Sequence, residues 1–151
     1  DPRKEKGVST TLPYFDTEEV VRVLHDSRVL VAQIEQASKE INNQEMHERL
    51  RRIAEWGRKI LQSIEKNPRD IRRVKKFLTT YLEGTQRITE GYVKMARQTH
   101  ADELAENFRK VLVTIEDVFQ EQHQKLLEND ILDLDVQIEV LAMQLKQEGV
   151  S

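Results

Sequence analysis

Residues 67–98, NPRDIRRVKKFLTTYLEGTQRITEGYVKMARQ, decide the fold because their apolar and small side chains recur at alternating steps of three and four residues. This spacing keeps one side of an α-helix buried over many turns and is typical of a long helix packed along one stripe. Asn67 is predicted to cap the helix, with Pro68 at its first position and Asp70 in its first turn. The recurring positions are Ile71, Val74, Leu78, Tyr81, Thr85, Ile88, Tyr92 and Met95.

A second column beside this stripe contains Phe77, Gly84 and Gly91, which follow one another at heptad spacing. A glycine inside a helix costs roughly 1 kcal/mol relative to alanine. Two glycines in one column predict that another backbone passes close to this flank of the helix. The alternative interpretation is that they are surface glycines that the helix tolerates.

The composition restricts the class of protein. The chain has 151 residues, which is enough for one domain with a proper core. Charged residues make up 34 % and aromatic residues 5 %, and there are only five Gly and three Pro, which favours long amphipathic helices. The lack of cysteine excludes a disulfide framework, a thiolate metal site and a cysteine nucleophile. No apolar run reaches the roughly 18 residues of a membrane span.

Capping residues and breaks in the apolar spacing predict where the other elements begin and end. Residues 1–13 show no periodicity and are interpreted as a flexible leader, followed by a single helical-bundle domain over residues 14–148. Asp16, with Glu19 three residues later, is predicted to cap the first helix. The apolar phase breaks at Asn43, so a second helix is expected over residues 44–66, with one bent helix through Asn43 as the alternative. A further helix is expected after a cap pair, Thr99 and Asp102.

The last segment, residues 131–147, fits two patterns. Its apolar residues alternate strictly with polar ones as in a strand, but they also form a stripe at helical spacing. A lone strand would leave a row of unpaired backbone groups, so a helix is expected. The chain is therefore predicted to be all-α, an antiparallel bundle of four or five long helices. The last helix has a second apolar stripe, expected to bind a partner or another copy of the chain unless other helices wrap it: Leu132, Val136, Val140 and Met143.

The charges are unevenly distributed along the chain. Residues 49–76 carry eleven Lys and Arg against three acids, whereas residues 102–151 carry twelve Asp and Glu against four bases. One interpretation is that two helical layers have complementary faces. The other is a basic face that docks on an anionic membrane surface or an acidic partner. The residues of this basic face are Arg49, Arg51, Arg52, Arg58, Lys59, Arg69, Arg72, Arg73, Lys75 and Lys76.

No set of residues in the sequence indicates catalysis, a metal site or a cofactor. None of the four histidines stands in a Glu-x-x-His or His-Glu-x-x-His pattern. Asp133 and Asp135 resemble an aspartate nucleophile motif, but that chemistry needs the end of a strand, and on a helix the two carboxylates diverge. The basic run lacks interleaved aromatic residues, so nucleic acid is not an expected partner.

Four segments carry a resemblance to a known family: residues 12–15 (LPYF), the helix around Trp56 and Gly57, the break at residues 66–68 (KNP), and residues 134–141 (LDVQIEVL). Together they resemble the 5-bromo-4-chloroindolyl phosphate hydrolysis family, the XpaC-like proteins. The resemblance covers nearly the whole chain after the leader. It implies a cytoplasmic helical domain of bacterial origin at the inner face of the membrane, held there through an upstream segment absent from this chain.

The resemblance also implies a partner of the toxic-anion (tellurite) resistance type. From the residues and the resemblance together, we expect a non-catalytic interaction domain of a membrane-associated protein, linked to toxic-anion or envelope-stress resistance. Self-association into a homo-oligomer is an additional expectation. The alternative, which the family name implies, is a phosphatase that hydrolyses phosphate monoesters such as 5-bromo-4-chloroindolyl phosphate.

Overall fold

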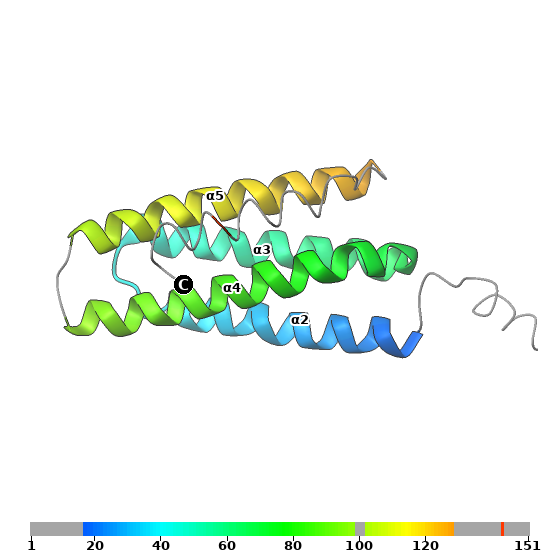
Figure 1. Cartoon of the computed structure of the whole chain (residues 1–151), viewed down its shortest axis with the longest axis horizontal. Helices are drawn as coiled ribbons and strands as arrows, with labels where there is room; N and C mark the ends of the chain where they lie inside the picture. Colours follow the sequence, from blue (N-terminus) through cyan, green and yellow to red (C-terminus); the bar gives the residue numbers. More distant parts are fainter. Residues whose placement is uncertain (1–16, 99–101, 129–142, 144–151) are drawn as a thin grey trace, which may run out of the picture.

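A computed structural model of the chain describes residues 17–98, 102–128 and 143 (Figure 1). The described elements, in chain order, are α2 (Thr17–Ser38), α3 (Gln44–Lys66), the short 3₁₀ helix η1 (Pro68–Asp70), α4 (Ile71–Gln98) and α5 (Asp102–Leu127). The long helices lie side by side, and successive helices run in opposite directions. The predicted all-α bundle is therefore confirmed over these ranges. The leader, the domain bounds and the expected helix over residues 131–147 fall outside them and stay predictions.

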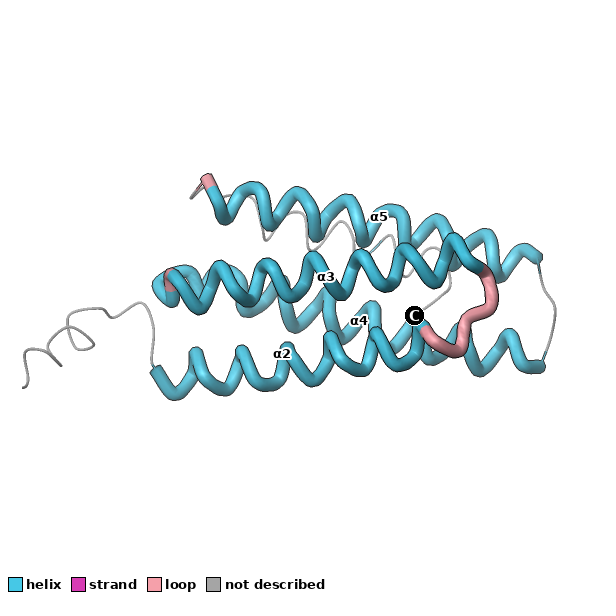
Figure 2. Tube along the Cα trace, turned by 180° about the vertical axis from the view of Figure 1, so that it is seen from behind, coloured by secondary structure: helices cyan, strands magenta, loops and turns pink. Residues whose placement is uncertain are grey.

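The helices are not packed equally on one another. Helix α2 contacts α3 and α4 closely, α3 also contacts α5 closely, and the backbones of α4 and α5 approach each other sparsely. Figure 2 shows the same arrangement from behind, with the loop between α2 and α3 at one end of the bundle. Aromatic rings span the wider distance between α4 and α5, because Phe77 lies 5.3 Å from Phe119 and Tyr92 stacks on Phe108 at 4.2 Å between ring centroids.

The break between α2 and α3 lies at Asn43. The Asn43 side-chain oxygen Oδ1 accepts a hydrogen bond from the Met46 backbone N–H at 3.0 Å, which makes Asn43 the N-cap of α3. The Nδ1 atom of His47 lies 2.8 Å from the carbonyl oxygen of Ser38 and ties the start of α3 to the end of α2. The predicted second helix is confirmed, and the alternative of one bent helix is wrong.

Asn67 and Pro68 occupy the predicted cap and first positions, but of the 3₁₀ turn η1 that leads into α4. The Asn67 side chain makes no capping hydrogen bond. Its backbone N–H instead donates to the Ser63 carbonyl at 3.0 Å and closes α3. Asn67 therefore closes α3 and also opens η1, where its carbonyl accepts a hydrogen bond from the Asp70 N–H at 3.3 Å. Residues Pro68–Asp70 form the 3₁₀ turn η1, and α4 begins at Ile71.

The buried stripe of α4 agrees with the predicted spacing until its last turns. The six positions from Ile71 to Ile88 are buried, and Leu78 is fully so. Tyr92 is half-buried and Met95 is 47 % exposed, while Val93 is buried in their place. An α-helix drifts by about 20° per heptad relative to a strict 3.5-residue repeat, so a stripe that starts in phase turns outward after several heptads.

The close approach to a glycine lies at Gly57 and is made by side chains; in the predicted column Gly84 is buried and Gly91 is open. A Cβ atom added to Gly91 would meet nothing within 4 Å, so the prediction of a close neighbour is wrong there. At Gly57 the added atom would lie 3.3 Å from Val31 of α2, 3.5 Å from Leu82 of α4 and 3.7 Å from Phe119 of α5. Side chains of α2, α4 and α5 therefore occupy the space that a side chain of α3 would take at Gly57.

We predict opposite effects on stability at these two glycines. Gly57→Leu should lower the free energy of unfolding by about 1–3 kcal/mol, because the larger side chain overpacks a filled centre. Leucine is a good helix former, so a loss would be steric. Gly91→Ala, the matched control, should raise stability by up to about 1 kcal/mol. Urea melts measure both, and a Gly57→Leu protein as stable as the parent would contradict the convergence.

Candidate functional site

The structure divides the predicted basic face into two groups, and the first is used inside the fold. Arg49 and Arg52 of α3 both donate to Glu116 of α5, with Arg49 Nη1 at 3.0 Å and Arg52 Nε at 2.5 Å from its carboxylate oxygens. Glu116 is only 9 % exposed. The hydrogen bond to Glu116 raises the pKa of Arg52 above its ordinary value. The Glu116 carboxylate thus lies between two guanidinium groups and links α3 to α5. These charge-assisted hydrogen bonds take the place of the hydrogen bonds that the three side chains would otherwise make to water.

Three more cations of α3 also have neighbours within the fold. Arg58 donates to Glu35 of α2, and this hydrogen bond lowers the pKa of the Glu35 carboxyl. Arg51 pairs with Glu48 one turn earlier in α3. The Lys59 Nζ atom lies 4.7 Å from the centre of the Trp56 ring, in cation–π geometry. Arg58, like Arg49 and Arg52, thus supports the interpretation of complementary helix faces, whereas Arg51 and Lys59 contact residues of their own helix.

One histidine adjoins this group. The ring of His123 on α5 lies 5.5 Å from that of Trp56, centroid to centroid. Burial first, and the charge of Lys59 second, lower the pKa of His123 below its ordinary value. The imidazole is therefore neutral at physiological pH and packs as a ring against tryptophan.

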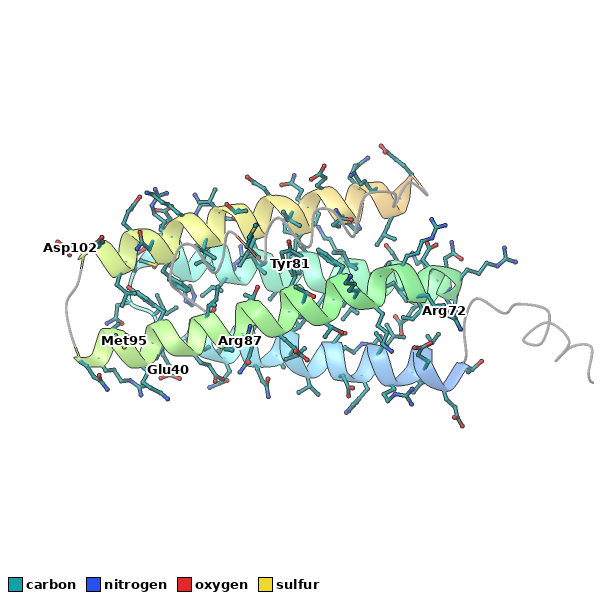
Figure 3. All side chains as sticks on the ribbon, viewed as in Figure 1. Glu40, Arg72, Tyr81, Arg87, Met95 and Asp102 are labelled. Carbon is teal, nitrogen blue, oxygen red and sulfur yellow. The ribbon has the colours of Figure 1, made fainter. Side chains whose placement is uncertain are left out.

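The second group of cations lies in the η1 turn and in the first turns of α4. Arg69, Arg72 and Arg73 are exposed, and within the described residues none of them forms an ion pair or a hydrogen bond through its side chain. Figure 3 shows Arg72 at the end of the bundle where α4 begins. Farther along α4, Lys75 pairs with Glu19 of α2 at 2.8 Å, and Lys76 is exposed. Lys66, the last residue of α3, is exposed as well. We call the exposed cations nearest the η1 turn the basic corner: Lys66, Arg69, Arg72 and Arg73.

The predicted apolar interaction stripe is placed at one position only. Leu132, Val136 and Val140 lie outside the described residues, and Met143 is 59 % exposed. The stripe thus stays a prediction. The structure adds a surface that the sequence analysis missed, although its spacing was visible in the sequence. This outer stripe of α2 consists of exposed residues at steps of four, four and three: Val21, His25, Val29 and Ala32.

Sequence reasoning also missed a groove at the opposite end of the bundle, because it needs α2 and α4 side by side. Two adjoining hollows of about 240 and 250 Å³ share Glu40, Val93 and Arg97. Arg97 donates to Glu40 across the space between the helices. Figure 3 labels Glu40 near Met95 at this end of the bundle. Because a carboxylate already neutralises Arg97, the groove is a poor cradle for a phosphate group.

The described part of the chain contains no arrangement suited to hydrolysis. None of its His, Asp and Glu side chains form a group of three or more that could hold a metal ion. Tyr81 is fully buried, and burial raises the pKa of its phenol, so it remains protonated and inaccessible. Asp133 and Asp135 lie outside the described residues. None of the described helices is long and apolar enough to cross a membrane.

We predict that the Glu116 bridge contributes measurably to stability. Glu116→Gln should lower the free energy of unfolding by about 1–2 kcal/mol, because the two arginines lose a charged acceptor of the same shape. The partial exposure of both arginines keeps the effect below that of a fully buried pair. Asp117→Asn, at the exposed neighbouring position, is the matched control and should stay within about 0.5 kcal/mol of the parent. Equal urea midpoints for the two variants would refute a contribution from the bridge.

Comparisons with known proteins bear on the family of the chain. A family model described as 5-bromo-4-chloroindolyl phosphate hydrolysis protein matches residues 3–141. No curated protein and no solved structure matches the chain. The match includes the four segments that carry the resemblance, and it extends over all of the described long helices.

Proposed function

We propose that this chain, which belongs to the family of 5-bromo-4-chloroindolyl phosphate hydrolysis proteins, works as a non-catalytic helical interaction domain of a membrane-associated protein. Its place is the cytoplasmic side of the membrane, and its partner is a protein of the toxic-anion (tellurite) resistance type, as the resemblance implies. The observation that carries the proposal is the outer stripe of α2.

The outer stripe is unusual because α2 already buries a full apolar stripe against α3 and α4. On the opposite side, Val21 is 62 % exposed and Val29 is 42 % exposed, two turns apart along the helix. A helix that is apolar on both sides, with one side in water, is typical of an interaction surface. Covering each valine with a partner would contribute about 1 kcal/mol. His25 between them adds a polar contact that can set the register of a partner helix.

The double change Val21→Glu with Val29→Glu tests this surface. Both side chains point away from the core, so the far-UV circular dichroism should be unchanged. Capture of a toxic-anion resistance protein from membranes of the native host, measured by mass spectrometry, should fall at least about tenfold, because two carboxylates would be buried unpaired. The matched control is Thr79→Glu with Gln98→Glu, which adds the same charge to exposed positions of α4.

Each result of this experiment decides something. Undiminished capture by the Val21→Glu, Val29→Glu protein would show that the outer stripe is not the partner surface. Loss of the helical signal would show that the valines belong to the core. If the purified parent elutes from size exclusion as a dimer and the Val21→Glu, Val29→Glu protein elutes as a monomer, the partner is a second copy of the chain.

Hydrolysis of phosphate monoesters is the second candidate function, and the family description is the observation that favours it. The described residues offer that chemistry little support, because the cations of α3 face carboxylates or tryptophan and the arginines of the basic corner lie on an open surface. Phosphoryl transfer needs cations, a nucleophile and commonly a metal ion converging on one point.

We predict that the purified chain does not hydrolyse 5-bromo-4-chloroindolyl phosphate, with or without added divalent metal ions. The reason is that no described nucleophile is aligned with a base or with a phosphate cradle. The measurement is a colorimetric assay on the parent and on the Asp133→Asn and Asp135→Asn variants. Metal-dependent turnover that co-purifies with the parent and disappears in either variant would establish the phosphatase instead.

A further inference from the structure

The basic corner is a run of positive charge on the outer side of one helix end. Residues 66–76 carry six Lys and Arg against Asp70 as the one acid. Arg69, Arg72 and Arg73 are three and four residues apart, so they share one face across η1 and the first turn of α4. The opposite face holds the buried Ile71 and Val74. The core stripe thus fixes the direction in which the arginines point.

This arrangement is unfavourable for the isolated fold in two respects. Like charges three or four residues apart on a helix repel one another. Cations near the start of a helix also face the positive end of its macrodipole. Lys75 on the next turn is compensated by Glu19 of α2, but Arg69, Arg72 and Arg73 have no such acid among the described residues. A charge pattern that costs stability and lies outside the core points to a counter-charge that the described residues do not supply.

The basic corner lies at the end of the bundle where α2 begins. The Lys75–Glu19 ion pair joins the second turn of α4 to the first turn of α2, and Figure 1 shows the start of α2 and the α3–α4 turn at the same end.

We propose that the basic corner docks the bundle end-on onto an anionic lipid surface. A membrane fits better than an acidic peptide for two reasons. The arginines stand at the end of the bundle opposite the hollows around Glu40 and Arg97 (Figure 3), and none of them lines the hollow between Arg28 and Glu65. They form an exposed, open surface, which suits a broad layer of phosphate headgroups. The proposal rests on the membrane association in the proposed function and adds the surface and the lipid chemistry.

Vesicle binding of the full chain tests this docking. The probes are vesicles of phosphatidylcholine alone and of phosphatidylcholine mixed with phosphatidylglycerol, at low and high salt. The parent should bind only the anionic vesicles, and salt should weaken the binding because exposed charges are screened. Each cation near such a surface strengthens binding roughly fivefold, so Arg69→Gln, Arg72→Gln and Arg73→Gln together should weaken it on the order of a hundredfold.

The matched control removes three exposed cations from the other end of the bundle, by Lys39→Gln, Lys94→Gln and Lys110→Gln. It has the same net charge as the arginine variant and should bind anionic vesicles within about fivefold of the parent. Thermal melts accompany the binding assay. The arginine variant should melt no lower than the parent, because its substitutions relieve repulsion and touch no core contact.

Three results would overturn the docking surface. The first is equal binding to neutral and anionic vesicles, or binding that salt does not weaken. The second is an equal loss in the control and the arginine variant, which would reflect net charge alone. The third is displacement from the vesicles by polyglutamate at low concentration, which would identify an acidic protein as the preferred partner. None of these depends on the partner capture by the α2 stripe, so the two proposals can fail separately.

Discussion

The convergence of helices at Gly57 is the constraint on which the rest of the bundle depends. Because α3 has no side chain at this point, Val31, Leu82 and Phe119 can approach it from the three other long helices. The close approach on one side is balanced by a wide separation of α4 and α5 on the other. The rings of Phe77, Tyr81 and Phe119, together with the stacked Tyr92 and Phe108, fill that separation and let a bundle with unequal spacing remain close-packed.

The charges of the chain serve two different purposes. On α3 they are directed at neighbouring helices, where Arg49 and Arg52 share Glu116 and Arg58 pairs with Glu35. At the basic corner they are directed outward, with repulsion left in place. The same residue type therefore contributes to the fold in one helix and, in the docking proposed above, to recognition in the next. Local conflict with stability is expected at sites that serve a partner rather than the fold.

The described helices contain no place where several polar side chains converge, although the family description names a hydrolysis reaction. A phosphatase would need several charges aimed at one point, whereas these helices spread their charges along outer faces or neutralise them in pairs. Two surfaces of the described helices are available for recognition, the outer stripe of α2 and the basic corner. One is apolar and the other cationic, and they suit a protein partner and a lipid surface respectively.

The sequence by itself determined the helices, the bounds of α3 and the buried stripe of α4, because hydrophobic spacing and the Asn43 cap are local properties. It also contained the spacing of Val21 and Val29, which could have been found there. Only the tertiary structure decided which cations are neutralised, because Glu116 and Arg52 are 64 residues apart. It likewise decided that side chains of other helices pack closely against Gly57 and not against Gly91. The role of Asn67 at the end of α3 was also visible only in the structure.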